Sequence, residues 1–175
     1  MSLGVLGMDK WVADAGPFIH LDQIDHLFLL QKLPRLVIPA SVVREVSQHP
    51  SARRLRTLHH WANVTIVAVR PPRHQTVEAL GARTRLHRGE ADCLHIALTQ
   101  APCILLTDDL VARTVAERLH LEVHGTVGLI VWAVKRKWLS LNGAEEALEG
   151  LYHRSRLFIT YTIIERAIHT LRKSA

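Results

Sequence analysis

The chain has 175 residues, of which 48% are hydrophobic and 22% are charged. This length suits one domain with a sizeable core, which excludes a disordered chain and a small scaffold held together by disulfides. Lysine and arginine outnumber aspartate and glutamate by 22 to 16, and the resulting net charge of +6 favours a polyanionic partner.

The cysteines and the apolar runs predict a cytoplasmic protein. Cys93 and Cys103 stand alone in apolar stretches, so we expect reduced core residues. The best apolar run, 125–134, stops at the basic stretch 135–137 and falls short of the ~18 residues that a membrane span needs. The N-terminus has no basic region leading into a long apolar stretch, so we expect neither a signal peptide nor a membrane anchor.

Short apolar runs of β type alternate with segments of helical periodicity, which is typical of a parallel sheet covered by helices. Strands are predicted at 11–13, 36–38, 64–69, 103–106 and 121–123, and helices at 17–31, 40–48, 51–60, 74–83, 89–100 and 109–119.

After residue 124 the strand signal fades. Helices are predicted at 126–138, 143–153 and 161–173, with 157–160 as a short strand or an extended connector. We therefore expect one α/β domain with residues 1–9 as a tail, 10–124 as the core, and 125–175 as a helical extension packed on the same domain.

Five acidic residues occupy informative positions. Asp14 directly follows the first predicted strand, and Asp109 comes shortly after the fourth. Open α/β sheets bind ligands at the carboxyl ends of their strands, so both face one crevice if these strands flank the switch in strand order. Glu45 lies about a turn into the helix after the second strand, and Glu90 and Asp92 lie in the first turn of the helix before the fourth.

Each acid also has a purely structural interpretation. Asp108 or Asp109 can cap the helix that begins there, and Glu90 or Asp92 can complement a helix N-terminus. Glu45 can be a solvated helix residue. Only the shared location of these acids at one end of the sheet favours a common role.

Clustered carboxylates favour a metal site. Two carboxylates ~5 Å apart repel by roughly 3 kcal/mol at an effective dielectric of about 20, so four together need protons or cations. Oxygen ligands select Mg²⁺ or Mn²⁺, and such an ion activates a water and offsets phosphate charge. No Ser-His-Asp order, zinc-spaced Cys/His cluster or phosphate-binding glycine loop competes with this interpretation.

Six segments match the motifs of one family in their order and spacing: 12–19, 37–46, 89–98, 104–109, 113–119 and 125–130. Together they resemble the PIN domain, a nuclease fold shared by VapC-type toxins and ribosomal-RNA-processing enzymes. The resemblance covers roughly residues 10–170 and is closest to a subfamily of predicted nucleic-acid-binding proteins that also has extra C-terminal helices.

The resemblance implies a three-layer α/β/α sandwich with a parallel sheet of about five strands in the order 3-2-1-4-5. It implies that Asp14 and Asp109 are metal ligands and that Asp92 is a ligand directly or through water. Glu45 would bind a second metal ion or orient the attacking water. The secondary candidates are Glu90, Asp108 and Thr107.

The sequence departs from the family pattern beside the first aspartate. The family usually has serine or threonine there, whereas this chain has Ala15 and Gly16, which reduces support for the metal site. Thr107 is the candidate to supply a hydroxyl nearby.

Residues 49–88 form a basic segment with eight arginines and one acid, Glu78, so the segment carries +7 and the rest of the chain −1. The two-pronged guanidinium group of arginine matches phosphate oxygens, which favours contacts to nucleic acid. For any single arginine, the alternative is a place on a solvated helical face. The predicted nucleic-acid contacts are Arg53, Arg54, Arg56, Arg85 and Arg88.

The leading hypothesis is therefore an Mg²⁺- or Mn²⁺-dependent endoribonuclease, toxin-like by resemblance, which acts on RNA through metal-activated water. The resemblance also implies a homodimer and an antitoxin partner. The alternative is a nucleic-acid-binding PIN module with weak or lost catalysis, which the departure at Ala15 and Gly16 supports. An aspartyl-phosphate enzyme fails on two counts. Position 16 is glycine where haloacid-dehalogenase-type enzymes need a second acid, and positions 103–134 lack the lysine that receiver domains need.

Overall fold

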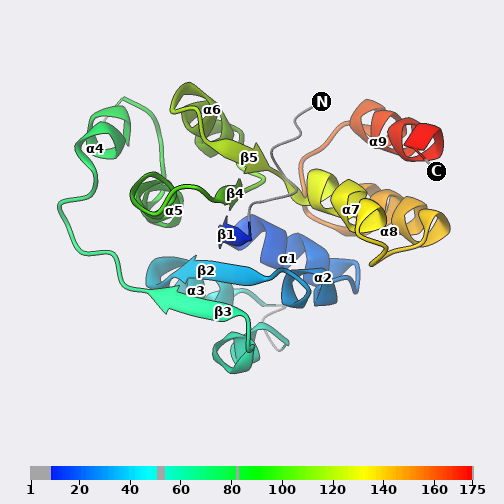
Figure 1. Ribbon diagram of the computed structural model, residues 1–175, viewed down its shortest axis with the longest axis horizontal. Helices are drawn as coiled ribbons and strands as arrows, with labels where there is room; N and C mark the ends of the chain where they lie inside the picture. The colour runs from blue at the N-terminus through cyan, green and yellow to red at the C-terminus, as the bar shows by residue number, and fades with distance from the viewer. Residues whose placement is uncertain (1–8, 51–53, 82, 175) are drawn as a thin grey trace.

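A five-stranded parallel sheet forms the centre of the molecule (Figure 1). The computed structural model describes residues 9–50, 54–81 and 83–174. The strand order is β3-β2-β1-β4-β5, which confirms the predicted sheet and its order. The strands are β1 (Lys10–Ala13), β2 (Arg35–Pro39), β3 (Val64–Val67), β4 (Ile104–Leu106) and β5 (Glu122–His124).

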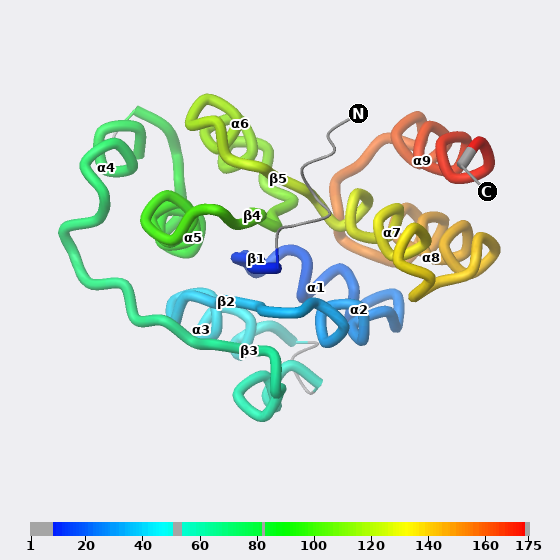
Figure 2. Tube along the Cα trace, viewed as in Figure 1, coloured from blue at the N-terminus to red at the C-terminus, as the bar shows by residue number. Residues whose placement is uncertain are grey.

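Helices cover both faces of the sheet, which gives the predicted three layers. Helix α5 packs on β1, β2 and β4, whereas α7 packs on β5 and α1. Figures 1 and 2 show α4 and α5 on one side of the sheet and α1, α7 and α8 on the other. The helices are α1 (Ala15–Gln23), α2 (Phe28–Gln31), α3 (Ala40–Gln48), α4 (Gln75–Gly81), α5 (Arg88–Thr99), α6 (Leu110–Arg118), α7 (Thr126–Lys135), α8 (Leu141–Arg154) and α9 (Tyr161–Ser174).

Two predicted helices are wrong in detail. The single helix predicted at 17–31 is broken into α1 and α2, because Asp25 has φ 62° and the amide of His26 returns to the carbonyl of Leu21 at 2.8 Å. Of the helix predicted at 51–60, residues 51–53 lie outside the described part, and 54–60 form the 3₁₀ helix η2. Residues 157–160 form a connector and not a strand.

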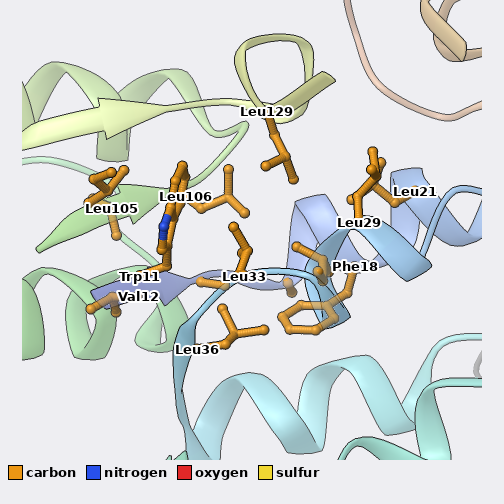
Figure 3. Close-up of a cluster of buried hydrophobic side chains, with 14 of the residues drawn as sticks. Trp11, Val12, Phe18, Leu21, Leu29, Leu33, Leu36, Leu105, Leu106 and Leu129 are labelled. Carbon is orange, nitrogen blue, oxygen red and sulfur yellow. The ribbon is translucent and has the colours of Figure 1, made fainter. Parts of the chain in front are cut away.

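The core fixes the positions of β1 and β4. Figure 3 shows Phe18 of α1, Leu106 of β4 and Leu129 of α7 in one cluster with Trp11 of β1. All four side chains are fully buried. Strands buried on both faces read as continuous apolar runs, which is why the sequence located them. The residues that follow these two strands are consequently held in place by the packing.

The C-terminal helices pack on the core. Trp132 of α7 lies 5.1 Å from the ring of Trp11 and 4.9 Å from the ring of Trp138, and α8 contacts α1. Cys93 and Cys103 are free and buried, as predicted. In the described part of the chain, no helix combines the length and apolarity that a membrane crossing requires.

Candidate functional site

Asp14 sits at the carboxyl end of β1 and is the N-cap residue of α1. Its amide bonds to the carbonyl of Leu106 at 3.0 Å, and the hydroxyl of Thr107 donates to its Oδ2 at 3.0 Å. The carboxylate is only 6% exposed, and its burial raises the pKa of Asp14 to about 6. The charges of Glu45 and Asp109 contribute to this rise, so the pocket disfavours the bare carboxylate.

Asp109 stands three residues beyond the end of β4 and is the N-cap residue of α6. It caps α6 by accepting the amide of Ala112 at 2.7 Å, so the capping interpretation holds for this residue. Its own amide donates to the Thr107 hydroxyl at 3.2 Å. Thr107 therefore bridges Asp14 and Asp109, and it supplies a hydroxyl to Asp14 although the neighbouring positions along the chain are alanine and glycine.

Glu45 reaches this place from α3. The position of Gly89 shows how close Glu45 comes to Asp14, because a Cβ added to Gly89 would lie 3.2 Å from Glu45 Oε2 and 3.5 Å from Asp14 Oδ1. The absent side chain of Gly89 thus leaves the space between the two carboxylates open. A larger residue would fill that space and push Glu45 away.

Glu90 is the third residue of α5 and is largely buried. Its Oε2 accepts the amide of His87 at 2.7 Å, which satisfies one helix N-terminal donor. Burial raises the pKa of Glu90 to about 7, and the charges of Asp109 and Asp14 add to the effect. Two acids with raised pKa values and coupled charges mark this as a functional-site candidate.

These four carboxylates line one cleft of about 850 Å³. They come from four separate parts of the chain: the ends of β1 and β4 and the helices α3 and α5. The cleft continues along α7 and the connector between α8 and α9. Its other polar lining residues include His20, Asp108, Arg113, His124, Arg156 and Thr160.

Asp92, the third predicted ligand, does not line this cleft. It is 2% exposed, accepts the hydroxyl of Ser41 at 2.5 Å, and forms an ion pair with Arg73 at 2.6 Å. Its charge is therefore already balanced by a protein cation. The structure brings Asp14, Glu45 and Asp109 together with Glu90 and leaves Asp92 in a separate ion pair.

Asp108 lies at the cleft wall with both oxygens engaged by protein donors. Oδ1 accepts the amide of Thr126 at 2.7 Å, and Oδ2 accepts the Thr126 hydroxyl at 2.5 Å and contacts Nδ1 of His20 at 2.7 Å. Asp108 thus ties the loop after β4 to the start of α7 and to α1. Its position supports the cleft without leaving an oxygen uncommitted.

None of the predicted arginines that the structure describes lines the cleft. Arg53 lies outside the described residues, and Arg54 pairs with Asp25 at 2.7 Å and with Asp22 at 3.7 Å. Arg56, Arg85 and Arg88 are exposed, and Arg88 opens α5 beside the acids. The arginines that line the cleft are Arg113 and Arg156, which the sequence reasoning missed because they lie outside the basic segment.

The carboxylates do not form a ready-made metal cage. Across residues 9–50, 54–81 and 83–174, no three histidine, cysteine, aspartate or glutamate side chains stand close enough to hold a metal ion as they are. The set is nevertheless chemically suited to a hard divalent ion, because all four donors are carboxylates and two of them are buried with raised pKa values.

A comparison with protein families identifies the fold. A family model described as a PIN domain matches residues 10–173. The chain belongs to the PIN-domain family. PIN domains are generally nucleases that use divalent metal ions. The match runs from β1 into α9, so the C-terminal helices are part of it, and the predicted resemblance is confirmed. A search of curated proteins found no match.

Proposed function

We propose that this PIN domain is an Mg²⁺- or Mn²⁺-dependent endoribonuclease whose acidic set is Asp14, Glu45, Glu90 and Asp109. The observation that carries the proposal is the shared cleft, onto which four separate parts of the chain each bring one carboxylate. Glu90 takes the place first predicted for Asp92, because Asp92 is paired with Arg73 and absent from the cleft lining.

The donors fit a hard divalent ion. Asp14, Glu90 and Asp109 stand at the carboxyl ends of strands or at the start of α5, and the missing side chain of Gly89 keeps Asp14 and Glu45 in reach of one space. Burial of like charges is unfavourable without a cation, which is what the raised pKa values of Asp14 and Glu90 express. When bound, Mg²⁺ or Mn²⁺ lowers the pKa of a water and offsets charge on the phosphate.

The protein groups have separable roles in this proposal. Thr107 fixes the orientation of the Asp14 carboxylate by donating its hydroxyl. Glu45 is exposed at the cleft, which suits it to accept a proton from an attacking water. Hydrolysis by water at phosphorus then leaves a 5′-phosphate and a 3′-hydroxyl, as the family resemblance implies.

The test is cleavage of single-stranded RNA by the purified protein in Mn²⁺, with EDTA as the chelated control. Asp14→Asn and Asp109→Asn should abolish cutting while circular dichroism shows an intact fold. Cleavage that continues undiminished in EDTA would remove the metal from the proposal.

A matched pair of variants tests the choice of Glu90 over Asp92. Glu90→Gln should weaken Mn²⁺ binding measured by calorimetry by about tenfold or more. Asp92→Asn should keep wild-type Mn²⁺ affinity, since that carboxylate is committed to Arg73 and Ser41. The reverse pattern would return Asp92 to the metal site.

The second candidate is a nucleic-acid-binding PIN module with weak or lost catalysis. It is favoured by the lack of a ready-made three-donor metal group among the described residues. It is weakened by the Thr107 hydroxyl, which bonds to Asp14 where the chain neighbours cannot. Calorimetry showing RNA binding without Mn²⁺ binding would decide for this candidate.

The biological setting stays a prediction from the resemblance and the composition. It comprises RNA as the substrate, a toxin-like role with an antitoxin partner, a homodimer and a cytoplasmic location. Co-expression with a neighbouring small open reading frame and sedimentation of the purified protein are direct checks.

A further inference from the structure

The connector between α8 and α9 presents a fully exposed aromatic side chain at the cleft. Phe158 has a relative exposure of 101%, although a folded protein gains from covering such a side chain. Phe158 lines the cleft together with its neighbours from Arg156 to Thr160. Figure 1 shows this connector, in orange, passing beside the start of α7.

The connector alternates between buried and outward positions. Leu157 and Ile159 are partly buried and pack against the core, whereas Arg156, Phe158 and Thr160 are exposed. An alternation with period two is typical of extended backbone, in which successive side chains point to opposite sides. The apolar pair therefore fastens the connector and leaves Arg156 and Phe158 on its outer side.

One hydrogen bond ties the connector to α1, and a second lies within the connector. The amide of Arg156 donates to Oε1 of Gln23 at 2.8 Å, and the hydroxyl of Ser155 accepts the amide of Leu157 at 3.2 Å. Helix α1 begins directly after Asp14, so it links the connector to the acidic set. Phe158 is thus held on the same rigid frame as the carboxylates, and the two groups share one cleft.

We propose that Phe158 and Arg156 form a subsite for single-stranded nucleic acid, in which one base stacks on the Phe158 ring and Arg156 contacts a backbone phosphate. The inference rests on the proposed nuclease function and deepens it by naming the side chains that would contact a base and a phosphate of the substrate. A base must leave its helical stack to lie on an aromatic face, so the subsite accepts single strands and rejects duplex.

Charge favours nucleic acid over a protein at this place. The cleft combines carboxylates suited to divalent ions with Arg113 and Arg156, and a phosphodiester chain is the ligand that needs both. Leu110 and Ile163 also line the cleft with exposed side chains, so the charged groups, and not the amount of exposed apolar surface, favour nucleic acid over a protein here.

The test measures binding of a fluorescein-labelled oligoadenylate of about ten nucleotides by anisotropy, with a duplex of the same length in parallel. All proteins carry Asp14→Asn, so that the RNA stays intact. Phe158→Ala and Phe158→Leu should each weaken single-strand affinity about tenfold, whereas Phe158→Tyr keeps the flat ring and the affinity. Arg156→Gln should lower the salt slope of binding by about one.

Phe28→Ala is the matched control, since Phe28 is an exposed phenylalanine on α2 away from the cleft, and it should leave affinity unchanged. The proposal is overturned if Phe158→Leu binds as tightly as the parent or if Phe28→Ala weakens binding equally. It is also overturned if Phe158→Ala only dissociates a dimer in sedimentation and RNA affinity stays the same.

The two proposals fail in different ways. Metal-dependent cleavage whose KM is unchanged by Phe158→Ala would reject the subsite and keep the nuclease. Binding that depends on Phe158 without metal-dependent cleavage would reject the nuclease and keep the subsite.

Discussion

Replacing Asp14 with asparagine should stabilise the metal-free protein, because the native pocket disfavours the aspartate charge. Burial raises the pKa of Asp14 from an ordinary 3.8 to about 6. Between these two pH values, the Asp14 carboxyl therefore keeps its proton in the folded state, whereas the unfolded chain has already released it. The free energy of unfolding of the wild-type protein must fall as the pH rises through it.

The magnitude follows from the same two values. A rise in pKa from 3.8 to about 6 costs, at about 1.4 kcal/mol per pH unit, up to about 3 kcal/mol of stability above pH 7. The asparagine side chain of the variant has no charge to desolvate, so Asp14→Asn should melt about 4–10 °C higher than wild type at pH 8 in EDTA. The difference should become small near pH 4, where the wild-type carboxyl is largely protonated in the folded state and about half protonated in the unfolded chain.

The assay is thermal unfolding followed by circular dichroism in EDTA between pH 4 and pH 8. Asp9→Asn, at an exposed aspartate, is the matched control and should show no such trend. Saturating Mn²⁺ should then reverse the order of stability, since only the wild-type protein keeps the full ligand set and gains binding energy. Equal melting temperatures for wild type and Asp14→Asn at pH 8 in EDTA would refute the reasoning about burial.

Four further predictions concern the surroundings of the site. Thr107→Val should weaken Mn²⁺ binding about 10- to 100-fold in calorimetry, and Thr107→Ser should restore it, because the hydroxyl orients Asp14; equal loss in both would point to packing instead. Gly89→Ala should also weaken Mn²⁺ binding, as its Cβ would crowd Glu45 Oε2 at 3.2 Å, and an unchanged affinity would contradict this geometry. Arg73→Met should cost about 3 kcal/mol in urea unfolding by stranding the buried Asp92 charge, and adding Asp92→Asn should recover part of the loss. Arg85→Gln with Arg88→Gln should reduce the salt slope of RNA binding by up to about two, and an unchanged slope would place the phosphate contacts elsewhere.

The strand positions were predictable, and with them Asp14 and Asp109. Buried parallel strands consist of continuous apolar runs, so their ends are visible in the sequence as the start of the polar residues that follow. Asp25 shows the opposite case. The break between α1 and α2 occurs at a residue with φ 62°, and no glycine or proline announced it. Aspartate tolerates this conformation well enough to end a helix without a strong signal.

Glu90 and Asp92 show where periodicity gives no answer. Glu90 lies in the first turn of α5 and Asp92 follows two residues later. Residues two apart on a helix point to different sides, so only one of these two acids can face the cleft. An apolar stripe would reveal the orientation of an ordinary helix, but residues 89–94 are all buried. What separates the two acids is Arg73, which comes from a distant loop and pairs with Asp92.

The basic segment illustrates the limit of composition. The eight arginines of 49–88 give a net charge that the sequence shows directly, but charge along the chain does not specify which side chain faces which surface. Arg54 forms ion pairs with Asp25 and Asp22, whereas Arg113 and Arg156, from outside the basic segment, line the cleft. Tertiary packing, and not local density of charge, decides which arginines are available to a phosphate.

The hydroxyl beside Asp14 comes from Thr107, the candidate expected from the sequence, and the strand register explains why. In a parallel sheet, the neighbours of a strand-end residue are supplied by the adjacent strand as well as by the next residues. The register pairs Ala13 with Leu106, so the residues that follow, Asp14 and Thr107, stand side by side. Ala15 and Gly16 therefore remove one source of support while the fourth strand provides another. The strand order 3-2-1-4-5 is enough to predict that the residue after β4 can supply the hydroxyl. The lack of a serine or threonine after the first aspartate is therefore a weak argument against metal binding.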